Sequence, residues 1–174
     1  GRLFQDGNQV ILHGNKGLEK LQGVAEGCGQ AMTVTADLTD EESVAAMFKE
    51  IAEIHHGLNG IVFAVAVPFP HKLTHRTPWS VFQNQIDSQL KAAHPSLTAT
   101  MPLLKACGPE QTGRALVIST EYAMGMPPIK IAPYVAAKAA LTAYAKVIAQ
   151  EWIAHNLRVH ILAPGMVISN LTAD

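Results

Sequence analysis

The stretch "GIVFAVAV" (residues 60–67) decides the fold class, because it is a continuous apolar run of the length of one β-strand. Apolar residues without polar alternation predict a strand that is covered on both faces. Such strands are typical of parallel sheets with helices on both sides, so an α/β fold is expected.

The segment before this strand predicts a helix with clear ends. It spans residues 38–57, "LTDEESVAAMFKEIAEIHHG". Thr39 precedes Glu42 by three residues, which is the spacing of a capping box, and Gly57 is expected to end the helix.

The rest of the chain alternates between strand and helix patterns. Residues 78–108 predict a long helical region that Pro95 and Pro102 kink or divide. Further strands are expected over 8–14, 31–37, 113–120 and 157–165, and further helices over 17–29 and 132–155. This alternation predicts βαβ units, and therefore a doubly wound parallel sheet in a single domain, residues 1–174.

Composition and charge argue against several functional classes. The net charge is −1 and no basic cluster occurs, so no nucleic-acid partner is expected. The most apolar run, 60–70, is too short to span a bilayer, and no membrane partner is expected. No signal peptide opens the chain, and the two cysteines, Cys28 and Cys107, form no disulfide framework. We therefore expect a cytoplasmic protein.

The eight histidines raise the question of a metal site. Only His71 and His75 stand four residues apart, with prolines close on both sides and no Cys, Asp or Glu nearby in the sequence. This surrounding favours solvated loop histidines, and no metal site is expected.

The run "APYVAAKAALTAY" (132–144) places a phenol and an ammonium group on one helical face, since Tyr134 and Lys138 are four residues apart. A cation about 4 Å from a phenol contributes on the order of 4 kcal/mol at a partly buried site. That energy corresponds to roughly three pKa units, enough to suit Tyr134 to proton transfer near neutral pH. The same spacing also occurs in solvated surface pairs, so the neighbouring segments must decide.

Those neighbours lie at the carboxyl ends of strands, where ligands bind in parallel sheets. Ser119 and Thr120 end the strand at 113–120, and "APGMVIS" (163–169) follows the strand that begins at 157. We expect both segments to meet Tyr134 in one cleft.

With these motifs the sequence resembles the short-chain dehydrogenase/reductase family. The resemblance covers nearly the whole chain and rests on "DLTD" (37–40), "LVIST" (116–120), "YVAAKAAL" (134–141) and "RVHILAPGMVISNLT" (158–172). It implies a Rossmann-like sheet and hydride transfer between a nicotinamide cofactor and a small carbonyl or secondary alcohol.

The resemblance also implies roles for individual residues. Tyr134 would be the acid/base, and Lys138 would lower its pKa and hold the nicotinamide ribose. Asp37 would bind the adenine. The segment that covers the nicotinamide would include Pro164, Gly165, Val167 and Ser169, the last at the family's threonine position.

The largest departure from the family is at the amino-terminal end. The glycine-rich TGxxxGxG loop has no counterpart, and the chain begins as if at the end of the first helix. In the strand order 3-2-1-4-5-6 the absent first strand would lie in mid-sheet. Either the chain is a piece of a longer protein or the sheet is rebuilt, and we favour the first.

Three positions near the expected site also differ. "FAVA" (63–66) replaces the family's NNAG, and Gln89 stands where an asparagine is usual. Glu121 is at the serine position thirteen residues before Tyr134, so Thr120 or Ser119 would have to supply the hydroxyl that donates to the carbonyl oxygen.

Three functions remain open. The first is a nicotinamide-dependent oxidoreductase, favoured by Tyr134 and Lys138. The second is a catalytically silent family member that stabilises an active paralogue, favoured by the lost NNAG and glycine-rich loop. A domain that senses a dinucleotide without chemistry is a weaker third alternative.

The choice of cofactor is expected to depend on the end of the strand at 8–14. An acidic residue there would bind a ribose 2′-hydroxyl and specify NAD. The segment "HGNKG" (13–17) carries no carboxylate but contains Asn15 and Lys16, which favours NADP.

The sequence also predicts assembly. Two helices carry stripes of apolar, mostly small residues: Ala136, Ala139, Ala140, Ala143 and Val147 in one, and Leu90, Ala93, Leu97 and Met101 in the other. Small side chains let helices of two subunits approach closely. We expect a homo-oligomer (a dimer or tetramer, as the resemblance implies) or a hetero-oligomer with an active paralogue.

Overall fold

The structure is a computed structural model that describes residues 2–15, 18–27, 29, 31–108 and 110–167. Two positions expected at the cofactor site, Lys16 and Ser169, lie outside the described residues, as does Cys28.

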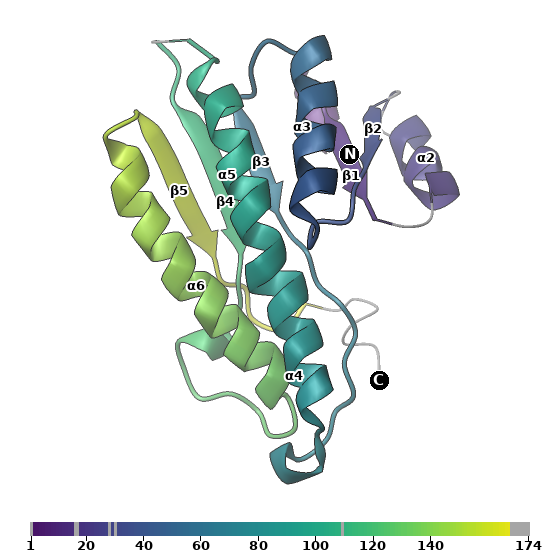
Figure 1. Cartoon of the computed structure of the whole chain (residues 1–174), viewed down its shortest axis with the longest axis vertical. Coiled ribbons are helices and arrows are strands. Elements are labelled where there is room, and N and C mark those ends of the chain that lie inside the picture. The colour runs from purple at the N-terminus through teal and green to yellow at the C-terminus, as the bar shows by residue number, and fades with distance from the viewer. Residues whose placement is uncertain (1, 16–17, 28, 30, 109, 168–174) are drawn as a thin grey trace.

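Five short strands form two separate parallel sheets (Figure 1). The strands are β1 (Ile11–Gly14), β2 (Met32–Thr35), β3 (Gly60–Phe63), β4 (Gly113–Ile118) and β5 (Leu157–Leu162). One sheet has the order β1-β2, with Ile11 opposite Met32. The other has the order β3-β4-β5, with Gly60 opposite Arg114 and Gly113 opposite Leu157. The expected α/β class with parallel strands is confirmed.

The two sheets meet where the missing strand was expected. β1 and β2 lie on the side of β3 that faces away from β4 (Figure 1). The facing edges of β1 and β3 pair with no strand in the described part of the chain. The overall sequence of strands is thus β2-β1, a gap, then β3-β4-β5. This matches the order 3-2-1-4-5-6 with strand 1 absent.

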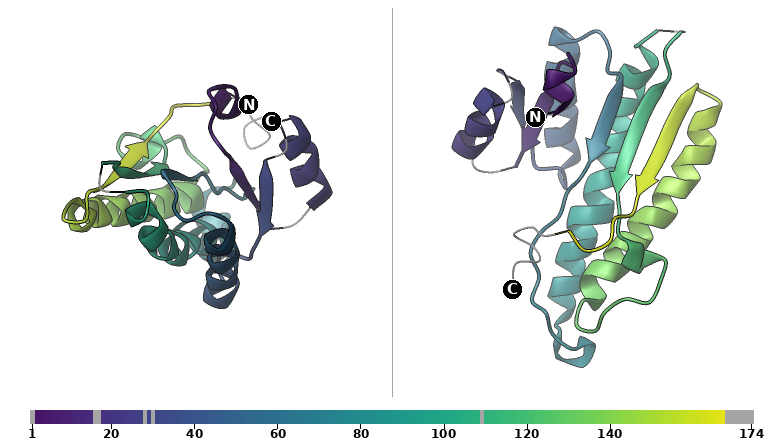
Figure 2. Two further views of the ribbon diagram at one scale, coloured as in Figure 1. Left: turned by 90° about the horizontal axis from the view of Figure 1, so that it is seen from above. Right: turned by 180° about the vertical axis from the view of Figure 1, so that it is seen from behind.

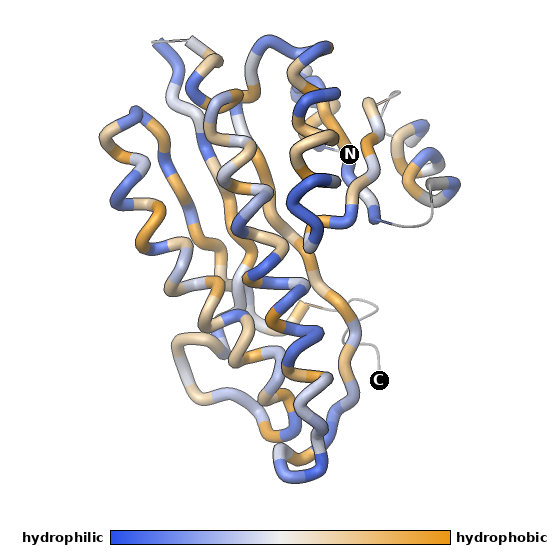
Figure 3. The backbone as a smooth tube through the Cα atoms, in the orientation of Figure 1, coloured by the Kyte–Doolittle hydropathy of each residue, from blue (hydrophilic) through white to orange (hydrophobic). Residues whose placement is uncertain are grey.

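The apolar run that indicated the fold forms a shorter strand than expected. β3 ends at Phe63, and the apolar chain continues from residue 64 as an irregular segment (Figure 3). Pro68 and Pro70 lie in this segment, and proline cannot donate to a sheet ladder. The segment passes instead toward the start of α4.

The described residues form six α-helices. They are α1 (Arg2–Gln5), α2 (Leu18–Gly27), α3 (Glu41–Ile54), α4 (Trp79–Ile86), α5 (Ala92–Lys105) and α6 (Ala132–Ile153). Short turns of helix occur at Thr74–Arg76 and Glu121–Ala123. Helices α3 to α6 lie along one side of the strands, and α2 lies beside β2 (Figure 2).

Helix α3 begins and ends differently from the expected capping box. Its N-cap is Asp40, whose side chain accepts a hydrogen bond from the Glu42 N–H. Thr39 donates through both its N–H and its hydroxyl to Asp37 Oδ1, so its side chain is turned away from the helix. The helix ends at Ile54, before Gly57. A Cβ at Gly57 would lie 2.9 Å from the Ala106 carbonyl carbon, so this glycine serves close chain packing.

The expected division of the 78–108 region at its prolines is wrong. Pro95 and Pro102 both lie inside α5. The interruption is instead a π-helical turn over Asp87–Lys91, between α4 and α5. A π turn has a wider hydrogen-bond register, and it ends four residues before Pro95, which has no N–H to donate.

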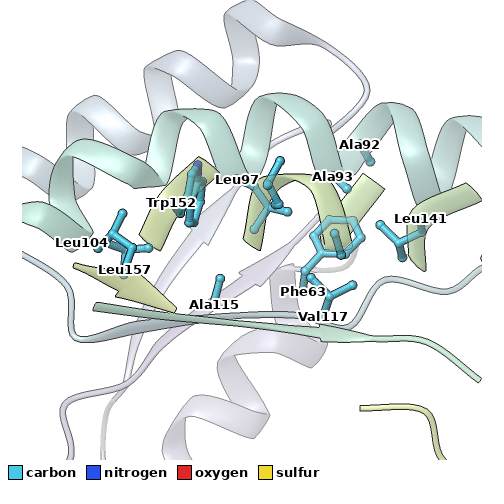
Figure 4. Packing of buried hydrophobic residues seen from close by; sticks show 12 residues of the cluster. Phe63, Ala92, Ala93, Leu97, Leu104, Ala115, Val117, Leu141, Trp152 and Leu157 are labelled. Atoms are coloured by element: carbon cyan, nitrogen blue, oxygen red, sulfur yellow. The ribbon is translucent and has the colours of Figure 1, made fainter. Parts of the chain in front are cut away.

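The main hydrophobic core lies between the β3-β4-β5 sheet and helices α5 and α6 (Figure 4). Leu97, Leu104, Val117 and Leu141 are completely buried there. Burial of each such side chain contributes about 2 kcal/mol. A second cluster packs α3 against β2 and α5, with Val34, Val44, Ile51 and Leu103 among its residues. The strands β4 and β5 are therefore packed against a continuous hydrophobic core.

The opposite face of the three-stranded sheet is open in the described part of the chain. Val62 of β3 and Leu162 of β5 are both more than half exposed there.

None of the described helices is long and apolar enough to cross a membrane. Among the described residues, no three His, Cys, Asp or Glu side chains are grouped so that they could hold a metal ion.

Candidate active site

The start of α6 brings the tyrosine to the carboxyl ends of β4 and β5. Ile131 caps the helix, and Pro133 in its first turn fits a position where no N–H is needed. Tyr134 follows directly, half-buried, and Lys138 lies one turn later toward the sheet. The loop before α6 and the segment after β5 converge here, because the Glu121 N–H donates to the Pro164 carbonyl oxygen at 3.1 Å.

The two candidate hydroxyls at the end of β4 have different neighbours. Thr120 makes a side-chain hydrogen bond with Tyr134. Ser119 Oγ lies 2.5 Å from Thr142 Oγ1, and the Thr142 hydroxyl donates to the Lys138 carbonyl oxygen. Thr142 has thus used its only hydrogen, so Ser119 must be the donor between them. The structure brings Thr120 to Tyr134, and it turns Ser119 into the helix.

Lys138 is only 3% exposed. Its Nζ donates to the Ile118 carbonyl oxygen at 2.7 Å and lies 6.0 Å from the centre of the Tyr134 ring. Burial lowers the pKa of Lys138 to about 8. The ammonium form is held by one backbone oxygen and by the face of an aromatic ring.

The expected lowering of the tyrosine pKa does not occur in this arrangement. Burial raises the pKa of Tyr134; the hydrogen bond with Thr120 lowers it in part, and Tyr122 raises it further. The expectation assumed a cation about 4 Å from the phenol oxygen. Lys138 instead lies over the ring and bonds to β4, so its charge does not outweigh desolvation.

Gln89 occupies the π-helical turn and is completely buried. Neither its amide nitrogen nor its amide oxygen has a hydrogen-bond partner among the described residues. Gln89 therefore makes no hydrogen bond to Tyr134, Thr120 or Lys138. Its neighbour one turn earlier, Gln85, donates through Nε2 to the Val67 carbonyl oxygen at 3.0 Å.

The residues expected at the cofactor lie at the same edge of the two sheets. Asp37 follows β2, and its Oδ1 accepts from Thr39, which fixes the carboxylate at the strand end. Asn15 follows β1 and is exposed. Pro164, Gly165 and Val167 follow β5.

Gly165 has a specific steric role. A Cβ there would lie 3.1 Å from Glu121 Oε1, so a larger residue would require the end of the Glu121 side chain to shift slightly. No described segment supplies a glycine-rich cradle for the pyrophosphate, and the edge of β1 faces the gap in its place.

Sequence reasoning missed one neighbour of the tyrosine. The Phe69 ring is stacked on the Tyr134 ring, with centroids 5.3 Å apart and planes 10° apart. Phe69 lies in the irregular segment after β3, 65 positions earlier in the chain. No periodic pattern or motif in the sequence singles it out.

Two cavities lie near the helices rather than at the phenol. One of about 270 Å³ is lined by Thr39, Glu41, Leu90, Lys91, His94, Pro95 and Tyr144. One of about 200 Å³ adjoins the start of α6 through Ala132 and Val135.

Comparisons with known proteins identify the family of the chain. A family model described as enoyl-(acyl carrier protein) reductase matches residues 2–174. Dehydrogenase/reductase SDR family member 4 of Homo sapiens is 30% identical over 173 residues, which are 95% of this chain and 59% of that protein. The chain thus spans less than two thirds of the length of this relative.

Solved structures show the same fold. The Pseudomonas aeruginosa RhlG/NADP active-site complex superposes with a TM-score of 0.88 at 18% identity, covering 98% of this chain and 67% of that one. A metagenomic short-chain oxidoreductase in complex with NADP gives a TM-score of 0.83 at 25% identity, covering 95% and 74%. The family model covers all but the first residue, and the chain belongs to the short-chain dehydrogenase/reductase family.

Proposed function

We propose that the chain provides the proton-transfer site of a nicotinamide-dependent oxidoreductase that interconverts a carbonyl compound and a secondary alcohol. The observation that carries this proposal is the Thr120–Tyr134 hydroxyl pair with Lys138 one helical turn away. The similarity to a dehydrogenase/reductase and to a short-chain oxidoreductase in complex with NADP supports the same class of reaction.

In this proposal the two hydroxyls share one substrate oxygen. Thr120 donates a hydrogen bond to the carbonyl oxygen, and Tyr134 gives its proton to that oxygen as negative charge develops there. In the reverse direction Tyr134 takes the proton from the alcohol. Lys138, protonated below its pKa of about 8, stabilises the tyrosinate through the face of the ring. A bound nicotinamide cofactor supplies or accepts the hydride.

The cofactor would be held by residues of three strand ends. Lys138 would bind the nicotinamide ribose, and Pro164, Gly165 and Val167 would cover the nicotinamide. Asp37 would contact the adenine. Asn15, with no carboxylate beside it, favours NADP over NAD. Gln89 would complete the site only through a water molecule, because it reaches none of the three active-site side chains directly.

A second function is favoured by a different observation. The raised pKa of Tyr134 is what a subunit without turnover would show. Such a subunit would stabilise an active paralogue in a hetero-oligomer.

The proposed assembly surface is the outer side of α6, where Ala136, Ala143 and Val147 are exposed. The stripe expected on α5 cannot form part of this assembly surface, because Ala93 and Leu97 are fully buried in the core.

A cytoplasmic location remains a prediction from the sequence.

Calorimetric titration of the full-length protein with NADPH and NADH, followed by turnover of a panel of aldehydes and ketones, tests the proposal. We expect both cofactors to bind, NADPH more tightly. Tighter binding of NADH would reverse the cofactor preference. If neither cofactor binds, the silent subunit is favoured. Light scattering of the protein alone and mixed with a paralogue would then show whether it forms a hetero-oligomer.

A further inference from the structure

The ring of Tyr134 has a second aromatic neighbour beyond the groups of the proposed reaction. Phe69 lies nearly parallel to it, with centroids 5.3 Å apart and an angle of 10° between the planes. Aromatic pairs in such offset stacks attract each other beyond the effect of their burial. The stack covers part of the phenol ring with an apolar surface, and burial raises the pKa of Tyr134.

Phe69 is itself held in place from three directions. Pro68 and Pro70 flank it and restrict the backbone on both sides. Two residues earlier, the Val67 carbonyl oxygen accepts from Nε2 of Gln85, a side chain with no exposed surface. The His71 ring lies against the Phe69 ring, with centroids 5.1 Å apart.

We propose that Phe69 is a positioning residue for Tyr134, and that its stacked ring fixes the phenol so that the hydroxyl stays on Thr120. This inference rests on the proposed function for its catalytic meaning, but the geometry can be tested without turnover. Phe69 does not transfer a proton. It restricts rotation of the tyrosine side chain, together with Thr120 and Lys138.

The chain contains only three tyrosines, so a direct spectroscopic test is practical. Protein labelled with ¹³C in the tyrosine rings should give three sets of NMR signals, and Tyr134→Phe identifies the set that belongs to Tyr134. In the unsubstituted protein, stacking should shift these signals upfield. In Phe69→Leu the shift should be lost. In Phe69→Trp, which restores a ring, it should return at least in part.

A pH titration of the same signals gives an independent readout. The pKa of Tyr134 should move from its raised value toward its ordinary one in Phe69→Leu, because water gains access to the ring. The charged and titratable groups that face this stack are Lys138, Tyr122 and His71. Lys138→Met is titrated in parallel so that its effect near pH 8 can be subtracted.

Phe82 provides a matched control. It is stacked on Trp79 in nearly the same geometry, with centroids 5.6 Å apart and planes 9° apart, but neither residue contacts Tyr134 by a ring stack. Phe82→Leu should leave both Tyr134 readouts unchanged. Phe69→Met, which keeps a large apolar side chain without a ring, replaces Phe69→Leu if circular dichroism shows that the leucine variant is unfolded.

Unchanged chemical shifts and titration of Tyr134 in a folded Phe69→Leu or Phe69→Met protein would overturn the inference. In an active preparation, kcat should fall up to about tenfold with little change in KM, and Phe69→Trp should restore it in part. A rise in kcat would show that Phe69 blocks the substrate, which also overturns the proposal. If the NMR results hold and no preparation shows turnover, the positioning role stands and the proposed oxidoreductase function fails.

Discussion

Ala115 and Val117 of β4 are completely buried beneath the helices, whereas every residue of β1 is only half-buried. The same contrast extends to the helices. Eight residues of α6 are buried, among them Lys138 and Thr142, but α2 buries Ala25 as its only core residue among those described. The residues proposed for proton transfer therefore rest on a well-packed core. The strand ends expected to bind the adenine end of a cofactor rest on α3 and an exposed α2.

The difference shows that the two halves of the proposed site depend on different parts of the chain. Tyr134, Thr120 and Lys138 are placed by β4 and α6, with Phe69 stacked on the Tyr134 ring, so their geometry does not require a strand in the gap. The proposed binding of a dinucleotide would depend on the region around the gap. Substitutions in each half test this difference.

The largest effect is expected at the phenol. Tyr134→Phe should lower kcat by a factor on the order of 10²–10⁴, because the proton donor is lost. Its thermal midpoint should change little, since the ring and its stack on Phe69 remain. The control is Tyr144→Phe, which removes the other α6 phenol and its contact with His94 Nδ1. Equal kinetics for Tyr134→Phe and the unsubstituted protein would rule out the proposed acid/base.

The contrast in packing is tested by two core truncations. Leu97→Ala, in the fully buried core of the three-stranded half, should lower the free energy of unfolding by about 3 kcal/mol. Ile11→Ala, in half-buried β1, should lower it by roughly 1 kcal/mol. Urea unfolding measures both. Equal losses would mean that β1 is as well packed as the main core, contrary to the structure.

Lys138 should reduce the free energy of unfolding at neutral pH, because its burial disfavours the charged ammonium group. Its pKa is lowered from 10.5 to about 8, so between these values the unfolded chain holds a proton that the folded chain has released. Stability should therefore rise as the pH increases from about 8 to about 10.5. Lys138→Met should lack this rise and be more stable at pH 7 by about 1–2 kcal/mol, after loss of the hydrogen bond to Ile118.

Urea unfolding of both proteins from pH 7 to 10.5 measures the difference. The titration of Tyr134 is common to both and largely cancels. Lys146→Met, at an exposed position of the same helix, should retain the rise. A rise of the same size in Lys138→Met would assign it to another group.

The smallest effect separates the two adjacent hydroxyls. Ser119→Ala should cost roughly 1 kcal/mol of stability through loss of its hydrogen bond to Thr142, with kcat unchanged. Thr120→Ala should instead lower kcat while stability changes little. The reverse pattern would show that Ser119 turns toward the substrate and that the assignment of Thr120 is incorrect.

Several features could be read from the sequence because they depend on local patterns. The alternation of strands and helices, the position of the missing strand and the Tyr134–Lys138 spacing are of this kind. The choice between Ser119 and Thr120 could not be made, since it depends on Thr142, one turn beyond Lys138 on another element. The lowered tyrosine pKa was expected from spacing alone, but the position of Lys138 Nζ is set by the Ile118 carbonyl.

Other features depended on tertiary context. Pro95 indicated that the helical region would be divided at this residue. The interruption occurs instead at the π turn before it, and Pro95 lies inside α5. Phe69 belongs to a segment without secondary structure, so neither periodicity nor a motif connects it with Tyr134. The helix cap shifted by one residue from Thr39 to Asp40, because the threonine bonds to Asp37 instead.

The facing edges of β1 and β3 also have a consequence for how the molecule behaves in concentrated solution. An unpaired strand edge is a template on which a strand of another molecule can add, and continued addition leads to aggregation. Here each edge strand has only four residues, which limits the number of hydrogen bonds that an incoming strand can make. Short edges of this kind slow such growth without preventing it. We therefore expect the isolated chain to stay dispersed only when it is dilute, and to be protected by any segment that occupies the space between the two sheets.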